Sequence, residues 1–296
     1  MNFGIPDALS GVSHKTASLR RRPVKRSKKV PIQLFPANAQ KRYAYELNAF
    51  VSAMTALTKE HIYPQIEPIL SQAEHTRASY IKTDDVSDEI QAVVETTGQA
   101  LSETFPHARL HQAVLSVGLL VSRHNRKEVI KVLSFVSGVQ VRELFPAEPF
   151  LESELSAFVK HNIRLIQTVP SRYFSEIEGV LYRGAQQGLS HTSVKKQIAE
   201  RFGVSRNRAK VIARDQVGKL NSQLTQLRHQ ALGIKKYRWR TVGDERVRGN
   251  PSGLSPKATP SHWSREGKVF SWASPPQDGH PGQPIQCRCV PEPILP

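Results

Sequence analysis

The chain has 296 residues, a formal net charge of +17, a hydrophobic content of 39% and two cysteines. This length allows one large domain or two ordinary ones. Two cysteines one residue apart exclude a disulfide framework, because a bridge between them would be strained. No apolar run reaches the roughly 20 residues of a membrane span, and the first residues lack the basic-then-apolar order of a signal peptide. We therefore expect a protein that stays inside the cell, or inside something assembled there, and makes no membrane contact.

The positive charge is concentrated at the two ends of the chain. Residues 1–33 carry eight basic residues and one acidic residue, a net charge of +7. Residues 34–170 carry thirteen basic and fifteen acidic residues, and residues 171–296 carry twenty-one basic and nine acidic ones. Clustered charge of this kind usually faces polyanions such as nucleic acids, although a solvated basic surface is the plainer alternative. We take the same limits as domain boundaries.

Residues 1–33 are predicted to form a basic arm. They contain too few apolar residues to fold alone in water. Seven cations in this arm are candidates for contacts to nucleic-acid phosphates without sequence preference: Arg20, Arg21, Arg22, Lys25, Arg26, Lys28 and Lys29.

Residues 34–170 have the pattern of a helical region. Apolar side chains recur at spacings of three and four, which is typical of helices that bury one face. Pro64 and Pro68 predict a break or kink in the first helix. The expected helices lie at 36–79, 85–105, 107–124, 126–137 and 152–167.

Residues 171–296 are predicted to combine helices at 171–233 with a small β module at 234–296. Expected helices lie at 171–188, at 193–203 with Gly203 as a cap, and from Ser205 to Gly233. After Gly233 the sequence alternates, and "KKYRWRTV", "GKVFSWA" and "CRCV" predict short strands. The fold class is therefore α+β, with a predominantly helical N-terminal and middle region followed by a small β-containing module.

Cys287 and Cys289 lie near the end of the chain, after two histidines. In an extended segment their side chains point to the same face, with Arg288 on the other. Together with His262 and His280 they form a Cys2His2 set. Zinc binds such sets tetrahedrally, and the bound metal can stabilise a module whose core is small. The alternative is that two free cysteines simply pack in the interior.

Two other functions are compatible with parts of the sequence. A zinc-dependent nuclease or toxin-like enzyme could use His262 and His280, with Asp244 or Glu245 as the base. A helix-turn-helix DNA-binding regulator could be built on residues 189–214, although its second helix is longer than a recognition helix.

The order "DERVR … H … EGKVFSW … PP … GHPGQPIQCRC" resembles the C-terminal pattern of the phage Mu F-like minor head protein family. That pattern has an Asp-x-Arg turn, then Cys or His, then Gly-Lys-x-Phe, His-Pro and Cys-Arg-Cys. The preceding helices, from "NIRLIQTVPSRYF" to "AKVIARDQ", also fit the family's layout. The resemblance covers about residues 155–293.

The resemblance also bears on the metal ligands. Many family members carry a Cys-x-x-Cys pair after the Asp-x-Arg turn. The first of these cysteines corresponds to Arg248 and the second to His262 in this chain. The resemblance favours structural zinc, and it leaves open a variant in which Arg248 and Asp244 form an ion pair in place of the metal. The expected ligands are His262, His280, Cys287 and Cys289.

The resemblance implies a minor head protein of a tailed phage, associated with the portal and acting in head assembly and in DNA packaging or exit. The implied place is the virion, inside the capsid near the portal vertex, after synthesis in the host cytoplasm. Expected partners are the portal protein ring, packaged double-stranded DNA bound without sequence preference and, as a further candidate, the major capsid protein. We expect no catalysis, so the protein is predicted not to be an enzyme.

Overall fold

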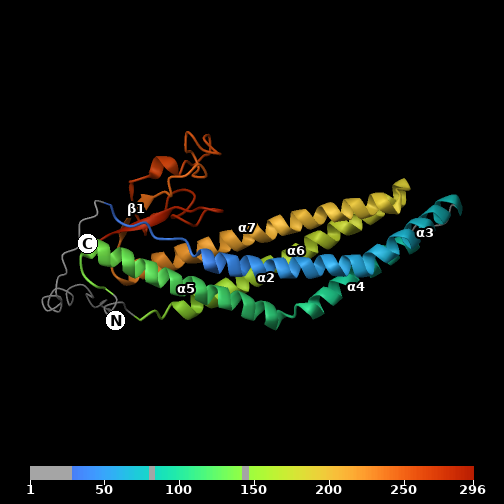
Figure 1. The fold of residues 1–296 in the computed structure, drawn as a ribbon, viewed down its shortest axis with the longest axis horizontal. Helices are drawn as coiled ribbons and strands as arrows, with labels where there is room; N and C mark the ends of the chain where they lie inside the picture. The colour runs from blue at the N-terminus through green and yellow to red at the C-terminus, as the bar shows by residue number, and fades with distance from the viewer. Residues whose placement is uncertain (1–28, 80–83, 142–146) are drawn as a thin grey trace. The chain divides into compact units, whose positions relative to one another are not determined.

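The computed structural model describes residues 29–79, 84–141 and 147–296. Helices dominate up to residue 231, and three short strands follow (Figure 1). The predicted α+β class is confirmed. Within the described ranges no helix is both long enough and apolar enough to cross a bilayer.

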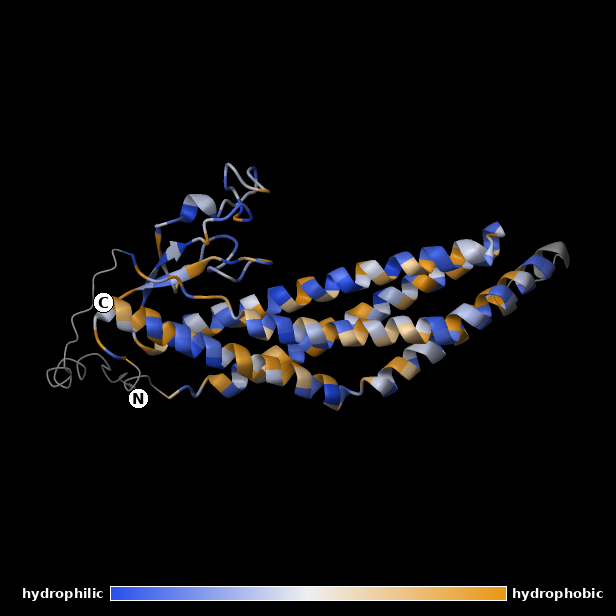
Figure 2. Cartoon of the chain, in the orientation of Figure 1, coloured by the Kyte–Doolittle hydropathy of each residue, from blue (hydrophilic) through white to orange (hydrophobic). Residues whose placement is uncertain are grey.

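The long helices are amphipathic, with hydrophobic and hydrophilic residues alternating around each of them (Figure 2). Between α2 and α3 the helical path changes to a π-helical turn at Thr58–Ile62 and a 3-10 turn at Tyr63–Gln65. Pro64 lies in this 3-10 turn, so the predicted interruption is confirmed. Pro68 is tolerated in the first turn of α3, where a missing N–H costs little. The helices are α2 (Ala37–Leu57), α3 (Ile66–Ser79), α4 (Asp84–Thr104), α5 (His107–Ser137), α6 (Leu151–Gln187) and α7 (His191–Ala231).

The chain divides into two compact units. The helical unit comprises Gln40–Val117 and Ala157–Arg214. Its core is made by the buried stripes of α2, α4, α6 and α7, as the spacing of three and four predicts. Two buried hydroxyl groups are satisfied across it: Tyr43 donates to Asn162 at 2.8 Å, and Tyr173 donates to Thr58 at 2.8 Å.

Two predicted helix ends in the middle of the chain are wrong. α5 continues through residue 125, because Asn125 is buried and its side-chain amide bonds Asn221 and Thr225 of α7. α6 continues through Pro170. Ile166 and Tyr173 are both 2% exposed on either side of this proline, so packing of the continuous apolar face outweighs the lost backbone hydrogen bond. The predicted boundary between residues 170 and 171 therefore falls inside one helix.

The predicted break at Gly203 is also wrong, because α7 runs through it without a turn. Gly203 is not among the glycines with positive φ, and the buried residues Ile198 and Ala209 lie on either side of it in one helix. A helix-turn-helix needs a turn at this point. Residues 189–214 therefore do not form that motif.

The sheet unit comprises the described residues within Met1–Ala39, Gly118–Ser156 and Asp215–Pro296. Its three antiparallel strands are β1 (Lys236–Arg240), β2 (Val269–Ser271) and β3 (Val290–Ile294), in the order β2-β1-β3. Tyr237 and Trp239 on β1 are fully buried, and the predicted alternation is confirmed. The cysteines of "CRCV" precede β3 instead of lying within it. The strand includes two prolines, which an edge strand tolerates.

The sheet unit also contains a buried ion pair. Arg228 on α7 is 1% exposed and donates to both carboxylate oxygens of Glu148, at 2.9 and 2.7 Å. The same guanidinium donates to the Ser122 carbonyl at 3.2 Å and to Asn125 at 2.5 Å. The Arg228 side chain of α7 thus binds two segments distant in sequence, the C-terminal half of α5 and the segment around Glu148.

His229, next to Arg228, makes the stability of this unit depend on pH. Its ring is 1% exposed and packs edge-on against Trp272, with 5.7 Å between the ring centroids. Burial lowers its pKa from 6.5 to about 3. The folded protein therefore keeps this ring neutral at pH values where the unfolded chain takes up a proton.

We expect the free energy of unfolding to fall as the pH drops below about 6.5, because only the unfolded chain then binds a proton at this residue. The contribution should be about 1.4 kcal/mol per pH unit and should end near pH 3, where the folded protein also protonates. Urea unfolding at about pH 7, 6 and 5 should give a flatter dependence for His229→Gln than for the parent. Equal slopes for the two proteins would contradict the assignment.

Candidate metal centre

Loops between β1 and β2 hold the ring of His262 in place. The backbone N–H groups of His262 and Trp263 both donate to the carbonyl of Arg248 at 3.0 Å. Gly249, next in the chain, has a φ of 75°, and a Cβ there would lie 2.1 Å from the hydroxyl oxygen of Ser261. Only glycine allows the two loop segments to approach this closely. This approach brings His262 into the interior, where it is 2% exposed.

The segment before β3 carries the two cysteines. Gln286 has a φ of 53°, and its backbone N–H donates to the Asp215 carboxylate on α7 at 2.8 Å. The chain then runs extended, so Cys287 and Cys289 point inward, 9% and 5% exposed, while Arg288 points the other way. The predicted same-face arrangement of the two sulfur atoms is confirmed.

These segments bring three metal-binding side chains together. The Nδ1 atom of His262 lies 3.4 Å from the sulfur of Cys287 and 3.7 Å from that of Cys289. The three donor atoms all lie within 4.8 Å of one another, and all three residues are buried. The geometry therefore presents two sulfurs and one imidazole nitrogen to a common point.

Asp278 orients the histidine from the other side. Its carboxylate lies 2.8 Å from Nε2 of His262, and Arg265 donates to its other oxygen at 2.5 Å. Arg265 in turn lies over the ring of Trp239, 4.9 Å from the centroid. A carboxylate on the far nitrogen keeps Nδ1 available as a ligand, and metal-binding histidines usually have such a partner. The sequence does not predict this role of Asp278, because nothing in its spacing connects it with His262.

Each of these groups shifts the pKa of its neighbours. The hydrogen bond with Cys289 lowers the pKa of the Cys287 thiol well below its usual value, and His262 adds to this against the effect of burial. The same hydrogen bond, together with burial, raises the pKa of Cys289. Burial lowers the pKa of His262, but the contacts with Cys287 and Asp278 outweigh it and raise the pKa overall. The cluster thus favours a thiolate, the form that binds metals.

Residues 175–292 match the sequence model of the family described as "Phage Mu protein F like protein". This part of the chain is therefore similar to the phage Mu F-like family. The matched residues include the three clustered donors and Asp278. The resemblance expected from the sequence is thereby confirmed.

The chain also resembles a protein from Haemophilus influenzae (strain ATCC 51907 / DSM 11121 / KW20 / Rd) described as an uncharacterized protein. The two are 29% identical over 300 residues, and the alignment covers all of this chain and 59% of the relative. The chain thus spans about three fifths of that relative's length. No solved structure matches the chain.

The chain departs from the phage Mu F-like pattern at Arg248. The Arg248 guanidinium donates to the carbonyl of Ile285 at 2.6 Å. Asp244 instead binds Arg288, with both carboxylate oxygens at 2.5 Å, and this hydrogen bonding lowers the pKa of Asp244. The predicted Arg248–Asp244 ion pair is therefore wrong, because Arg288, turned away from the cysteines, takes that partner.

His280 lies outside the donor group formed by the described residues. Its Nδ1 atom is 2.8 Å from the hydroxyl of Tyr237, and its ring centroid is 4.8 Å from that of Trp272. Burial lowers its pKa. The structure thus brings together three of the four predicted ligands and places the fourth in the aromatic cluster beside them.

The three donors fit zinc. In a tetrahedral site with Zn–S of about 2.3 Å and Zn–N of about 2.05 Å, a sulfur and a nitrogen ligand lie about 3.6 Å apart. The two observed sulfur–nitrogen distances, 3.4 and 3.7 Å, bracket that value. A cavity of about 30 Å³ borders all three donors, with Val247 and Arg248 in its wall. That volume is enough for one water-sized fourth ligand.

The same geometry argues against the predicted enzyme alternative. Asp244 is neutralised by Arg288, and Glu245 lies 3.5 Å from Arg246, so neither forms a pair with His262 among the contacts found. A cavity of about 30 Å³ admits water but no nucleotide. The cluster therefore offers buried donor atoms and no room for a nucleotide substrate.

Most of the predicted phosphate-binding arm lies outside the described residues. Lys29 is the first residue that the structure describes. The other six predicted contacts lie outside the described residues: Arg20, Arg21, Arg22, Lys25, Arg26 and Lys28.

Proposed function

We propose that this protein is a minor head protein of a tailed phage, bound to the portal ring and active in head assembly and in DNA packaging or exit. The match of residues 175–292 to the phage Mu F-like family carries this proposal. In this role the protein lies inside the capsid near the portal vertex. It acts by binding other components, with the portal ring as main partner and the major capsid protein as a further one.

A structural zinc ion is the second part of the proposal. The sheet unit's aromatic cluster is small, and two of its five buried members are Cys287 and Cys289. Zinc held by these cysteines and His262 would tie the segment before β3 to the loop after β1. Such a tie supplies folding free energy that a small core lacks.

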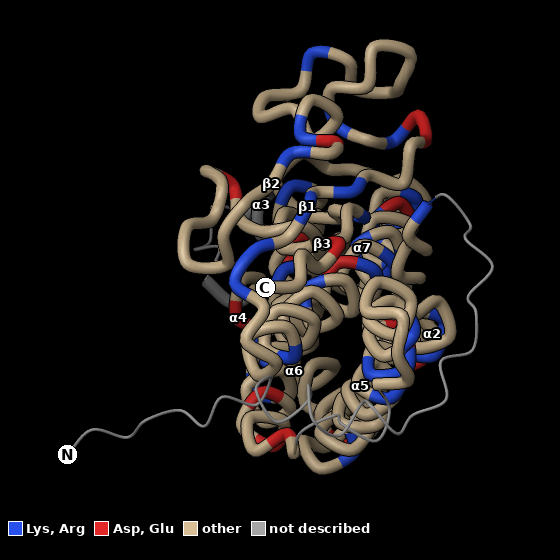
Figure 3. The backbone as a smooth tube through the Cα atoms, turned by 90° about the vertical axis from the view of Figure 1, so that its left-hand side faces the viewer, with Lys and Arg blue, Asp and Glu red and all other residues tan. Residues whose placement is uncertain are grey.

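Contacts to packaged DNA are the third part. Residues 234–296 carry ten basic and five acidic residues, and basic and acidic positions lie interspersed over the sheet and its loops (Figure 3). Each of the five acids pairs with an arginine. The positive excess therefore falls largely on lysines, including Lys235, Lys236, Lys257 and Lys268. These cations and the arm of residues 1–33 suit phosphate contacts without sequence preference.

Portal association can be tested by co-expressing the chain with a tagged portal protein of the same phage. After nuclease treatment, which removes DNA that could bridge two basic proteins, size-exclusion chromatography should show the chain eluting with the portal ring at a constant ratio. Elution of the chain alone, beside an intact ring, would contradict portal association.

A further inference from the structure

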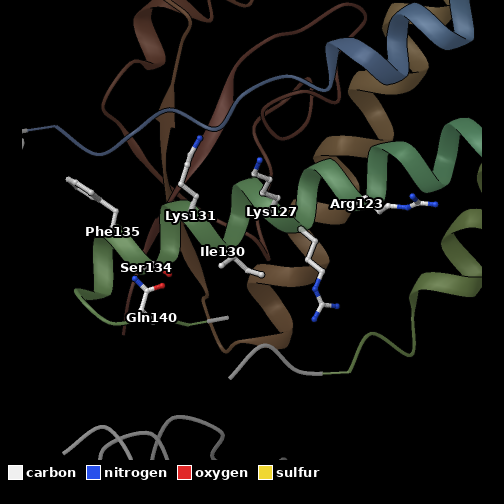
Figure 4. Close-up of a pocket in the computed structure, with 8 residues that line it drawn as sticks. Arg123, Lys127, Ile130, Lys131, Ser134, Phe135 and Gln140 are labelled. Carbon is white, nitrogen blue, oxygen red and sulfur yellow. The ribbon is translucent and has the colours of Figure 1, made fainter. Parts of the chain in front are cut away.

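A groove lies along the C-terminal half of α5, in the sheet unit. It has a volume of about 850 Å³, and its lining includes four cations, Arg123, Arg126, Lys127 and Lys131, together with Ile130 and Phe135. In Figure 4, Lys127 and Lys131 project from the same side of the helix, with Arg123 one turn before Lys127. This face has no part in the metal centre.

Residues 34–170 are nearly neutral overall, so their net charge does not indicate this cluster of cations. Nine residues, 123–131, contain four cations and one acid, Glu128. Glu128 pairs with Lys131, and Arg126 lies 3.4 Å from Glu148. Arg123 and Lys127 are exposed, and neither forms an ion pair within the described part of the chain.

A row of like charges on one helix face needs a physical reason. Arg123, Lys127 and Lys131 follow one another at intervals of four residues, and like charges at that spacing disfavour the helix. Eight residues of helix rise by about 12 Å. Over the same length of axis, duplex DNA presents about seven negative charges. A phosphate backbone laid along this face would therefore find a cation at each turn.

We propose that this face of α5 binds the sugar-phosphate backbone of double-stranded DNA without reading its sequence. The inference extends the DNA contacts of the proposed function to a surface within residues 34–170, a region whose net charge is close to zero. It does not require portal association, because the contact is a property of the free protein. The basic arm of residues 1–33 is a poor occupant, since it carries a net charge of +7.

An acidic protein helix is the rival partner for a basic groove. Helix-in-groove recognition uses several apolar anchors at i, i+3, i+4 and i+7. Here the apolar side chains are Ile130 and Phe135, both half-buried. Much of the remaining carbon surface belongs to the stems of lysine and arginine, which cover apolar area while their charged ends stay in water. The groove therefore favours a phosphate backbone.

The test compares two double variants of the full chain. Arg123→Gln with Lys127→Gln removes the two cations that have no ion pair in the described part of the protein. The matched control is Lys160→Gln with Arg164→Gln, which removes one lysine and one arginine at the same spacing from an exposed face of α6. Binding to a fluorescent DNA duplex of random sequence is measured between about 50 and about 200 mM salt.

For the α5 variant we expect the slope of log affinity against log salt to flatten by about 1.8, because two phosphate contacts are lost. The affinity lost between about 50 and about 200 mM salt should then be about twelvefold smaller than for the parent. The control should keep the parent slope, and neither pair should lower the melting temperature. Equal changes in the two variants, or none, would overturn the proposal. Parent-like DNA binding combined with lost portal binding in the α5 variant would identify an acidic protein as the partner.

Discussion

Replacing Cys287 and Cys289 together by serine should abolish zinc binding and unfold the β module of residues 234–296, while the helices persist. The parent should contain one zinc ion per chain, because the three clustered donors fit one tetrahedral ion. The free energy of binding at neutral pH should be on the order of 10 kcal/mol, as in small domains that depend on zinc. The effect should therefore exceed that of removing two small core side chains.

The chain contains three tryptophans, Trp239, Trp263 and Trp272, so tryptophan fluorescence reports on the β module of residues 234–296 alone. Chelation of zinc from the parent should shift the emission to longer wavelength, with helical circular dichroism largely retained, and added zinc should reverse the shift. This arm of the experiment separates metal loss from the effect of the serines themselves. A metal-free parent with a folded module would contradict the zinc site.

Two single variants refine the ligand set. His280→Gln should keep the metal, since His280 lies outside the donor group and binds Tyr237. Asp278→Asn should weaken zinc affinity by about 10- to 100-fold, because the carboxylate orients the ring of His262. Loss of zinc in the His280 variant alone would restore the four-ligand set expected from the sequence.

Glu148→Gln should lower the free energy of unfolding by about 3–5 kcal/mol. The substitution keeps the shape of the side chain but leaves the Arg228 guanidinium, with 0% side-chain exposure, without its counter-charge. Urea unfolding followed by circular dichroism measures the loss. Replacing both partners, with Arg228→Met and Glu148→Leu, should recover much of it, because no unpaired charge then remains in the interior.

Glu46→Gln is the matched control for this prediction. Its partner Arg42 lies at the same distance, 2.7 Å, but that pair is at the surface, with 54% and 20% of the two side chains exposed. Its loss should cost about 0.5 kcal/mol or less. Equal losses in the free energy of unfolding for the two glutamine variants would contradict the stabilising role of the Arg228–Glu148 pair.

Local pattern was enough to predict β1, β2 and the direction of the cysteines, whereas β3 begins only after the cysteines of the predicted strand "CRCV". Tyr237 and Trp239 alternate with arginines, and a strand has a period of two, so burial followed directly from the sequence. The same period placed Cys287 and Cys289 on one face. The helical character of residues 34–233 was predictable for a similar reason, since one apolar stripe per helix must be buried.

The continuity of the helices was not predictable, because it depends on packing between segments distant in sequence. Pro170 and Gly203 are local signals for an end, yet both lie inside helices whose buried faces continue past them. Asn125 is buried only because Asn221 and Thr225 lie opposite it. Local propensity is a weak guide where tertiary contacts supply the larger free energy.

The ligand types of the candidate site were predicted from the sequence, but the residues that support these ligands were not. Residue types and family pattern pointed to His262, His280 and the two cysteines, and all of these except His280 meet as expected. Asp278 and Asp215 were assigned no role, because their roles arise from loops that fold back on the ring of His262 and on the backbone of Gln286. The hydrogen bond between Tyr237 and His280 was not predicted either, because β1 and the loop that carries His280 meet only in the folded chain.

Membership of the phage head is tested most directly by quantitative mass spectrometry of particles purified after induction of the phage that encodes this chain. We expect its peptides in DNA-filled heads separated from tails, at a constant ratio to the portal protein across the fractions of a density gradient. Intact heads that contain portal and major capsid protein but no peptide of this chain would contradict the proposed function.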